Sequence, residues 1–169
     1  VVLFNIDSKS EVNGKQSKVA IVSVLQNVFN EMQGFSGSNP FLADLERKLT
    51  EEGKYNLFKE KFEDSFGSAW EESRSDFDFI QDDVVEVLDE IGFMSIEAGR
   101  NWCEKATGEY TYKVEDFARL VKKYLDKKES NHHIVFLIDE IGQYIGDDSK
   151  LMLNLQTVTE DLGTACGGK

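Results

Sequence analysis

The fold is decided by the stretch Ile134-Val135-Phe136-Leu137-Ile138-Asp139-Glu140. Five consecutive apolar residues, rich in β-branched side chains, are followed at once by two carboxylates. A short, continuous apolar run of this kind is typical of a buried strand in a parallel sheet, whereas a half-exposed strand alternates apolar and polar residues. The stretch therefore predicts a buried parallel strand that carries two adjacent carboxylates at its C-terminal tip.

A second strand of the same type opens the chain. Residues 1–6 read Val-Val-Leu-Phe-Asn-Ile and are followed by an acidic residue, Asp7. Helical patterns fill most of the remaining sequence, so the order is strand, helix, several short helices, strand and helix. Strand–helix–strand units form parallel sheets with right-handed crossovers. We therefore predict an α/β fold with two neighbouring parallel strands and a mainly helical insertion.

Composition shifts and helix breakers divide the chain into three parts. Residues 1–33 are expected to form the first strand and an amphipathic helix that begins at Ser17 or Lys18. Residues 34–131 form a helical, acidic insertion. Residues 132–169 form the second strand and a following helix.

Local capping signals predict several helix boundaries. Asn39 suits an N-cap and Pro40 the first helical position of the insertion's first helix. Later helices are predicted to begin at Ser75-Asp76 and at Ser95. The last helix is predicted from Asp148-Ser149 to a glycine, Gly163, and the glycine-punctuated residues 142–146 before it are predicted to form a connection.

The charge of the chain is strongly negative and unevenly distributed. There are 32 acidic and 19 basic side chains, and residues 44–116 carry 21 acidic and 9 basic ones, a net charge of −12. Such a segment repels phosphate backbones, so we expect no direct nucleic-acid binding. No apolar run approaches the ~20 residues of a membrane helix. Cys103 and Cys166 match neither a disulfide framework nor a metal-binding spacing, which favours a reduced, cytoplasmic setting.

The two carboxylates that end the second strand have a specific use in nucleotide hydrolysis. Ligands of open α/β sheets bind at the C-terminal tips of parallel strands. There Asp139 would hold Mg²⁺ at the nucleotide phosphates, and Glu140 would polarise the attacking water. Gln143, a little further on, could reach the nucleotide or a neighbouring subunit. The same pair also occurs at strand ends that are merely polar, so the motif alone leaves both interpretations open.

Three stretches resemble one family. Residues 136–146, Phe-Leu-Ile-Asp-Glu-Ile-Gly-Gln-Tyr-Ile-Gly, resemble the Walker B region of the P-loop ATPases of BREX phage-defence systems, the BrxC/PglY type. The continuation in residues 151–157 and 160–163 is similar to that family, as are residues 4–10, Phe-Asn-Ile-Asp-Ser-Lys-Ser. The helical middle shows only a general similarity.

The resemblance implies a fold, cofactors and partners. It implies a P-loop NTPase sheet of the additional-strand type, in which the two strands seen here are spatial neighbours. It also implies a very large cytoplasmic ATPase that uses ATP and Mg²⁺ and acts with other BREX components against phage DNA. In such an ATPase Asp139 would be the Mg²⁺ ligand and Glu140 the catalytic carboxylate.

The phosphate-binding motif of such ATPases is missing from this sequence. No Gly-x-x-x-x-Gly-Lys-Ser/Thr occurs, and Gly14-Lys15 lacks the upstream glycine and is followed by Gln16. The sequence opens in a core strand and closes in the glycine-rich residues 164–169, so we expect an internal fragment of a longer ATPase. Without the phosphate loop, this fragment is expected neither to bind ATP tightly nor to hydrolyse it.

Other features have simpler interpretations. His132 and His133 lack the further ligands of a zinc site and suit a polar strand start. Cys103, beside Trp102, suits packing because no nearby group would lower its pKa.

The aromatic stretch of residues 58–79 suits a helical core, with an exposed docking surface as the alternative. A non-enzymatic helical interaction module is accordingly the alternative function. Open sheet edges also make a homo-oligomer conceivable.

Overall fold

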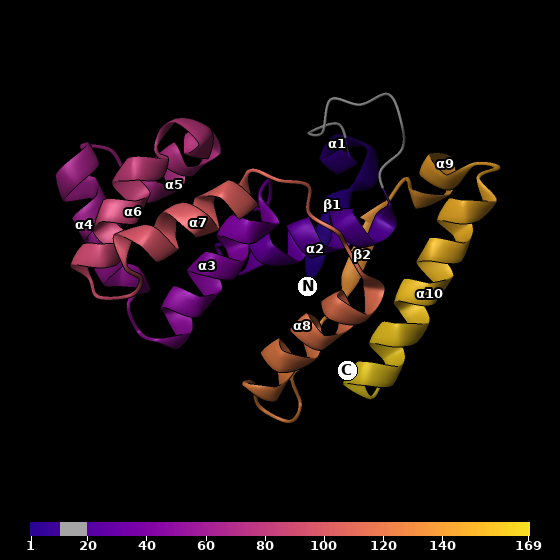
Figure 1. Ribbon diagram of the computed structural model, residues 1–169. Helices are drawn as coiled ribbons and strands as arrows, with labels where there is room; N and C mark the ends of the chain where they lie inside the picture. The colour runs from indigo at the N-terminus through magenta and orange to yellow at the C-terminus, as the bar shows by residue number, and fades with distance from the viewer. Residues whose placement is uncertain (11–19) are drawn as a thin grey trace. The chain divides into compact units, whose positions relative to one another are not determined.

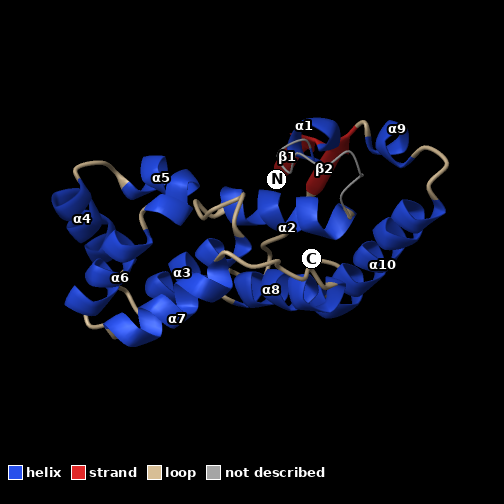
Figure 2. Ribbon diagram, turned by 45° about the horizontal axis from the view of Figure 1, so that its top comes forward, coloured by secondary structure: helices blue, strands red, loops and turns tan. Residues whose placement is uncertain are grey.

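The computed structural model describes residues 1–10 and 20–169 and divides them into two compact units (Figure 1). Unit 1 consists of residues 1–33 and 111–169, and unit 2 of residues 34–110. Helices form most of the chain, together with one small sheet (Figure 2). No helix among the described residues is long and apolar enough to cross a membrane. Gly14-Lys15 and the expected helix start at Ser17 or Lys18 lie outside the described residues.

The sheet of unit 1 has two parallel strands, β1 (Val2–Asn5) and β2 (Phe136–Asp139). Leu3 pairs with Leu137, and Asn5 pairs with Asp139 at the C-terminal ends. The prediction of two neighbouring parallel strands is therefore confirmed. The prediction that the second strand is buried was wrong, because every residue of β2 is half-buried or exposed and Leu137 is 48% exposed. Both strands have four residues, and β1 ends at Asn5 because Ile6 already belongs to the following helix.

The helices of unit 1 follow the predicted pattern with two differences. Their bounds are α1 (Ile6–Ser10), α2 (Ile21–Met32), α8 (Val114–Asp126), α9 (Ile141–Ile145) and α10 (Ser149–Cys166). The predicted connection at 142–146 was wrong, since α9 occupies most of it. The predicted end of the last helix at Gly163 was also wrong. The helix runs three residues further, and Gly167 ends it with a left-handed φ of 63°.

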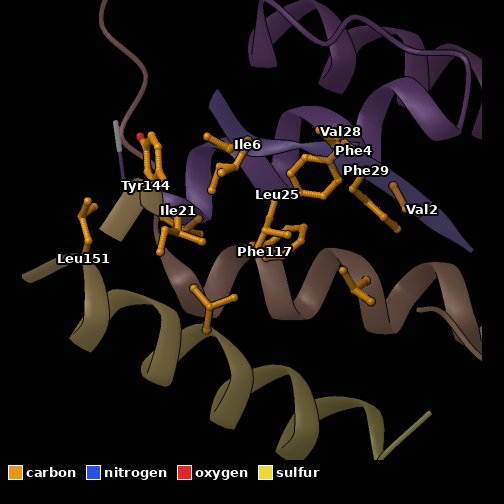
Figure 3. Packing of buried hydrophobic residues seen from close by; sticks show 14 of the residues in the cluster. Val2, Phe4, Ile6, Ile21, Leu25, Val28, Phe29, Phe117, Tyr144 and Leu151 are labelled. Atoms are coloured by element: carbon orange, nitrogen blue, oxygen red, sulfur yellow. The ribbon is translucent and has the colours of Figure 1, made fainter. Parts of the chain in front are cut away.

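The core of unit 1 packs one face of the sheet against helices (Figure 3). Val2 and Phe4 of β1 lie against α2, whose Phe29 is completely buried. The Phe29 ring meets that of Phe117 from α8 edge-on, at 5.9 Å between centroids. The opposite face of the sheet is bare, and Leu3 is 73% exposed on it. Buried parallel strands are usually covered on both faces. In this sheet, by contrast, the described residues cover one face alone.

Unit 2 is entirely helical. It contains α3 (Pro40–Glu51), α4 (Tyr55–Phe66), α5 (Trp70–Ser73), the 3-10 helix η2 (Arg74–Phe79), α6 (Gln81–Glu90) and α7 (Ile96–Ala106).

Capping predictions in this unit had mixed outcomes. The Asn39 side chain accepts hydrogen bonds from the two backbone amides after Pro40, at 3.0 and 3.2 Å, so this helix start is confirmed. Ser95 caps α7 in the same way. The predicted helix start at Ser75-Asp76 was wrong. These residues belong to η2, whose backbone is kinked at Asp76, and α6 begins only at Gln81, after the non-helical Ile80.

The core of unit 2 is built on aromatic rings and one buried carboxylate. Phe58, Phe62 and Trp70 are completely buried and in mutual ring contact. Much of the aromatic stretch is therefore core, although Phe79 is 90% exposed. Glu46 is also completely buried, and its side chain accepts four hydrogen bonds. The donors are the Ser36 amide, the Tyr55 hydroxyl, the Trp70 indole N–H and the Arg74 guanidinium.

The compact unit 34–110 is shorter than the predicted insertion of residues 34–131. The difference is α8, which packs in unit 1 beside α10 (Figure 1). Phe117 and Val121 of α8 are completely buried in the core of unit 1. A strongly amphipathic helix belongs to the unit whose core buries its apolar face. The position of the helix in the sequence does not show which unit that is.

Candidate functional site

The candidate site lies where both strands end, and we define the strand-end site as Asn5, Asp139 and Glu140. Asn5 and Asp139 are the last residues of β1 and β2 and occupy paired positions in the sheet. The chain enters α1 after Asn5 and α9 after Glu140. The carboxyl ends of adjacent parallel strands thus bring together residues more than 130 positions apart, at the edge where α/β folds bind ligands.

Asn5 uses both ends of its side-chain amide. Its Oδ1 accepts the backbone N–H groups of Asp7, at 3.0 Å, and Ser8, at 3.2 Å, which begins α1 with an Asx-type turn. Its Nδ2 donates to Oε2 of Glu140 at 2.7 Å. Because the two backbone donors fix which end of the amide is the oxygen, the remaining NH₂ group faces Glu140.

Glu140 sits in an unusual backbone conformation. Its φ is 60° and its ψ is 14°, the one left-handed non-glycine residue among those described. Such a conformation is uncommon and mildly costly for a residue with a Cβ atom, and it concentrates at functional sites. Here it turns the chain sharply out of β2, while the Glu140 N–H donates to Oδ1 of Asp139 at 3.0 Å.

Both carboxylates are exposed. Neither forms an ion pair with a lysine or arginine in the described part of the chain. Asn5 holds one oxygen of Glu140, so the other oxygen can accept from a water or ligand. Asp139 similarly accepts one backbone amide through Oδ1, and its second oxygen is available. The arrangement therefore presents two acidic oxygens at the end of the sheet.

The residues fit a magnesium ion that shares its ligands with a nucleotide. Mg²⁺ prefers oxygen donors and is commonly held by one or two carboxylates together with substrate phosphates and water. Asp139 supplies such a donor. No group of three or more His, Cys, Asp and Glu side chains that could hold a metal occurs among the described residues. This chain would thus supply part of the coordination shell and the phosphates the rest.

Gln143 lies apart from this hydrogen-bonded group. It is exposed on α9, and no hydrogen bond joins it to Asp139 or Glu140 among the described residues. Its predicted role at the nucleotide or at a neighbouring subunit remains a prediction.

The other reactive side chains found in the sequence are occupied elsewhere. The His132 ring packs edge-on against Tyr124, at 6.0 Å between centroids. Cys103 is buried in the core of unit 2, and burial raises the pKa of its thiol to about 11. A thiol that stays protonated is a poor nucleophile, so its location suits the predicted packing role.

Asn5 is the member of the strand-end site that sequence reasoning missed. The sequence feature that could have identified it is a polar amide side chain at the last position of an otherwise apolar strand. The pairing register with β2, which gives this position its meaning, depends on the fold and is not visible in the local sequence.

Comparison with known proteins adds no further constraint. No family model matches this sequence, and no solved structure matches this fold.

Proposed function

We propose that this chain is part of a P-loop ATPase of the BREX type, with Asp139 as the Mg²⁺ ligand and Glu140 as the water-activating carboxylate. The observation that carries the proposal is the convergence of Asn5, Asp139 and Glu140 at the ends of two adjacent parallel strands. The resemblance of residues 136–146 to a Walker B region supports it from the sequence.

The proposed chemistry assigns each residue a separate task. Asp139 would hold the ion through the carboxylate oxygen that does not accept the Glu140 amide. When bound, Mg²⁺ neutralises charge on the β- and γ-phosphates. Glu140 accepts a hydrogen bond from the attacking water and polarises it as a general base. Asn5 holds the other Glu140 oxygen, so the carboxylate has a defined direction.

The remaining parts of the ATPase lie outside this sequence. The phosphate loop that supplies most phosphate affinity is absent from it, so ATP binding belongs to the longer protein. That protein would work in the cytoplasm with other BREX components. Phage DNA would be reached through the longer protein, because this acidic chain is a poor surface for nucleic acid.

The Mg²⁺ role of Asp139 can be tested in a longer form of the protein that includes the flanking sequence. Fluorescent ATP binding is measured with Mg²⁺ and with EDTA. Wild type should bind ATP more tightly with Mg²⁺ than with EDTA. In Asp139→Ala, ATP binding in the presence of Mg²⁺ should weaken by roughly tenfold or more, so that the difference between the two conditions is lost. Asp147→Ala, a nearby exposed acid, is the control. An unchanged Mg²⁺ dependence in Asp139→Ala would remove this residue from the site.

A second candidate function is a helical protein-interaction module. Residues 34–110 form a compact unit with its own core, and the unit carries 19 acidic and 8 basic side chains. The sequence upstream of this chain separates the two functions. A glycine-rich loop ending in Lys-Ser or Lys-Thr within ~50 residues before Val1 supports the ATPase, and its absence supports the module.

A further inference from the structure

One segment of unit 2 carries negative charge that the unit does not neutralise. Residues 71–83 contain six carboxylates and one base, Arg74. Arg74 is turned inward, and its guanidinium lies 2.8 Å from the buried Glu46 carboxylate. Glu71 pairs with Lys59 at 3.1 Å. The five other carboxylates form no ion pair with any residue that the structure describes. The outward charge of this segment is therefore available to a partner.

An exposed aromatic ring stands within the same segment. Phe79 is 90% exposed, whereas Phe77 and Ile80 on either side of it are buried. The chain is thus anchored in the core around Phe79 while its ring remains in water. An anchored aromatic side chain that is kept exposed is typical of an interface residue, because its burial by a partner is favourable and costs little ordering.

A hollow of about 230 Å³ lies in the same segment, and its lining includes Ile80, the residue that follows Phe79. Its apolar lining comes from Phe66 and Ile80, and its acidic lining from Glu72 and Asp76. Phe66 is 39% exposed there. An apolar wall next to two carboxylates suits a lysine or arginine, whose aliphatic stem packs on the ring while its charged end reaches the acids.

We propose that Phe66, Glu72, Asp76 and Phe79, here called the Phe79 surface, dock a basic amphipathic segment of a partner protein. A lysine or arginine enters the hollow, and an apolar side chain of the same segment packs on Phe79. The acidic charge selects a basic partner and disfavours a phosphate-bearing one. The proposal develops the second candidate function and uses neither Asp139 nor Glu140.

The test measures binding of a synthetic, fluorescein-labelled peptide of alternating Lys and Leu residues to the whole chain. Fluorescence anisotropy is recorded at physiological ionic strength, where weak surface attraction is screened. We expect saturable binding that weakens at least about tenfold in Phe79→Ser and in the double variant Glu72→Lys/Asp76→Lys. All three residues are exposed, and circular dichroism of each variant is recorded to check that it folds.

The matched control is Glu97→Lys/Glu104→Lys, which makes the same charge change at exposed positions of α7. It should weaken binding less than about twofold. Equal loss in the control would show general attraction between a polycation and an acidic protein and would overturn the proposal. Unchanged binding by Phe79→Ser, or equally tight binding of a Lys/Ser peptide, would also overturn it. No nucleotide is present, so these outcomes leave the strand-end site untouched.

Discussion

At the scale of the residue, Asn5 joins two functions that one substitution can separate. Asn5→Asp keeps the oxygen that accepts the Asp7 and Ser8 amides but replaces the NH₂ donor with a second carboxylate facing Glu140. We expect the free energy of unfolding to fall by up to about 1 kcal/mol, a small value because the pair is exposed to solvent.

A double-mutant cycle shows whether the Asn5–Glu140 contact causes that loss. In Glu140→Gln, the new amide can donate to the Asp introduced at position 5, so Asn5→Asp should cost little in this background. Urea unfolding of the four proteins measures the coupling. An equal cost of Asn5→Asp in both backgrounds would mean that the contact contributes nothing.

Glu46 is the residue on which we expect unit 2 to depend most. Its buried carboxylate accepts hydrogen bonds from four groups, including Trp70 and Arg74. Glu46→Ala leaves those donors without a partner and should lower the unfolding free energy by about 3–5 kcal/mol. Glu97→Ala, on the surface, should change it by less than about 0.5 kcal/mol. Chemical denaturation checks both values, and similar small effects would show that the network is dispensable.

At the scale of the element, α2 is capped by a residue from another helix. Its N-cap position is Ala20, which has no capping side chain, and Oδ1 of Asn154 in α10 accepts the Val22 amide at 3.1 Å. Asn154→Ala should therefore cost about 1 kcal/mol, whereas Asn154→Asp keeps the acceptor and should cost little. Hydrogen exchange of the first amides of α2 reports the change locally. Equal exchange rates in the two variants would rule out this cap.

Elements whose boundaries depend on local chemistry were predictable from the sequence. Asn39 with Pro40 and Ser95 mark helix starts because the cap and the helix are neighbours in the chain. The two strands were predictable because each is a continuous apolar run. The start of α6 was mispredicted because a 3-10 helix comes before it, and similar residues open both kinds of turn. The cap from Asn154 to α2 was not predictable, since it joins residues far apart in sequence.

The candidate site was predictable to the same extent. Asp139 and Glu140 follow directly from the end of an apolar strand. Their partner Asn5 comes from the other strand, and its contact depends on the pairing register, which tertiary structure determines. The sequence did not show that α8 belongs to unit 1, because this assignment also depends on tertiary packing.

At the scale of the whole molecule, the chain combines an exposed pair of carboxylates at the end of β2 with no phosphate loop in its sequence. Backbone amides and the lysine of that loop provide most phosphate affinity in P-loop proteins. We therefore expect no stoichiometric ATP binding by this chain in isothermal titration calorimetry with Mg²⁺ present. Heat that saturates near one ATP per chain would contradict the assignment of phosphate binding to the flanking sequence.

We propose that Glu140 activates water, and ATP turnover by a longer form extended at both ends tests this role. Wild type is compared with Glu140→Gln, and ATP binding is measured for both. We expect wild type to turn over, whereas Glu140→Gln should still bind ATP but lose at least about 100-fold in kcat. Equal turnover by the two proteins, or no nucleotide binding by either, would show that the Asp139–Glu140 pair is structural and would favour the interaction module.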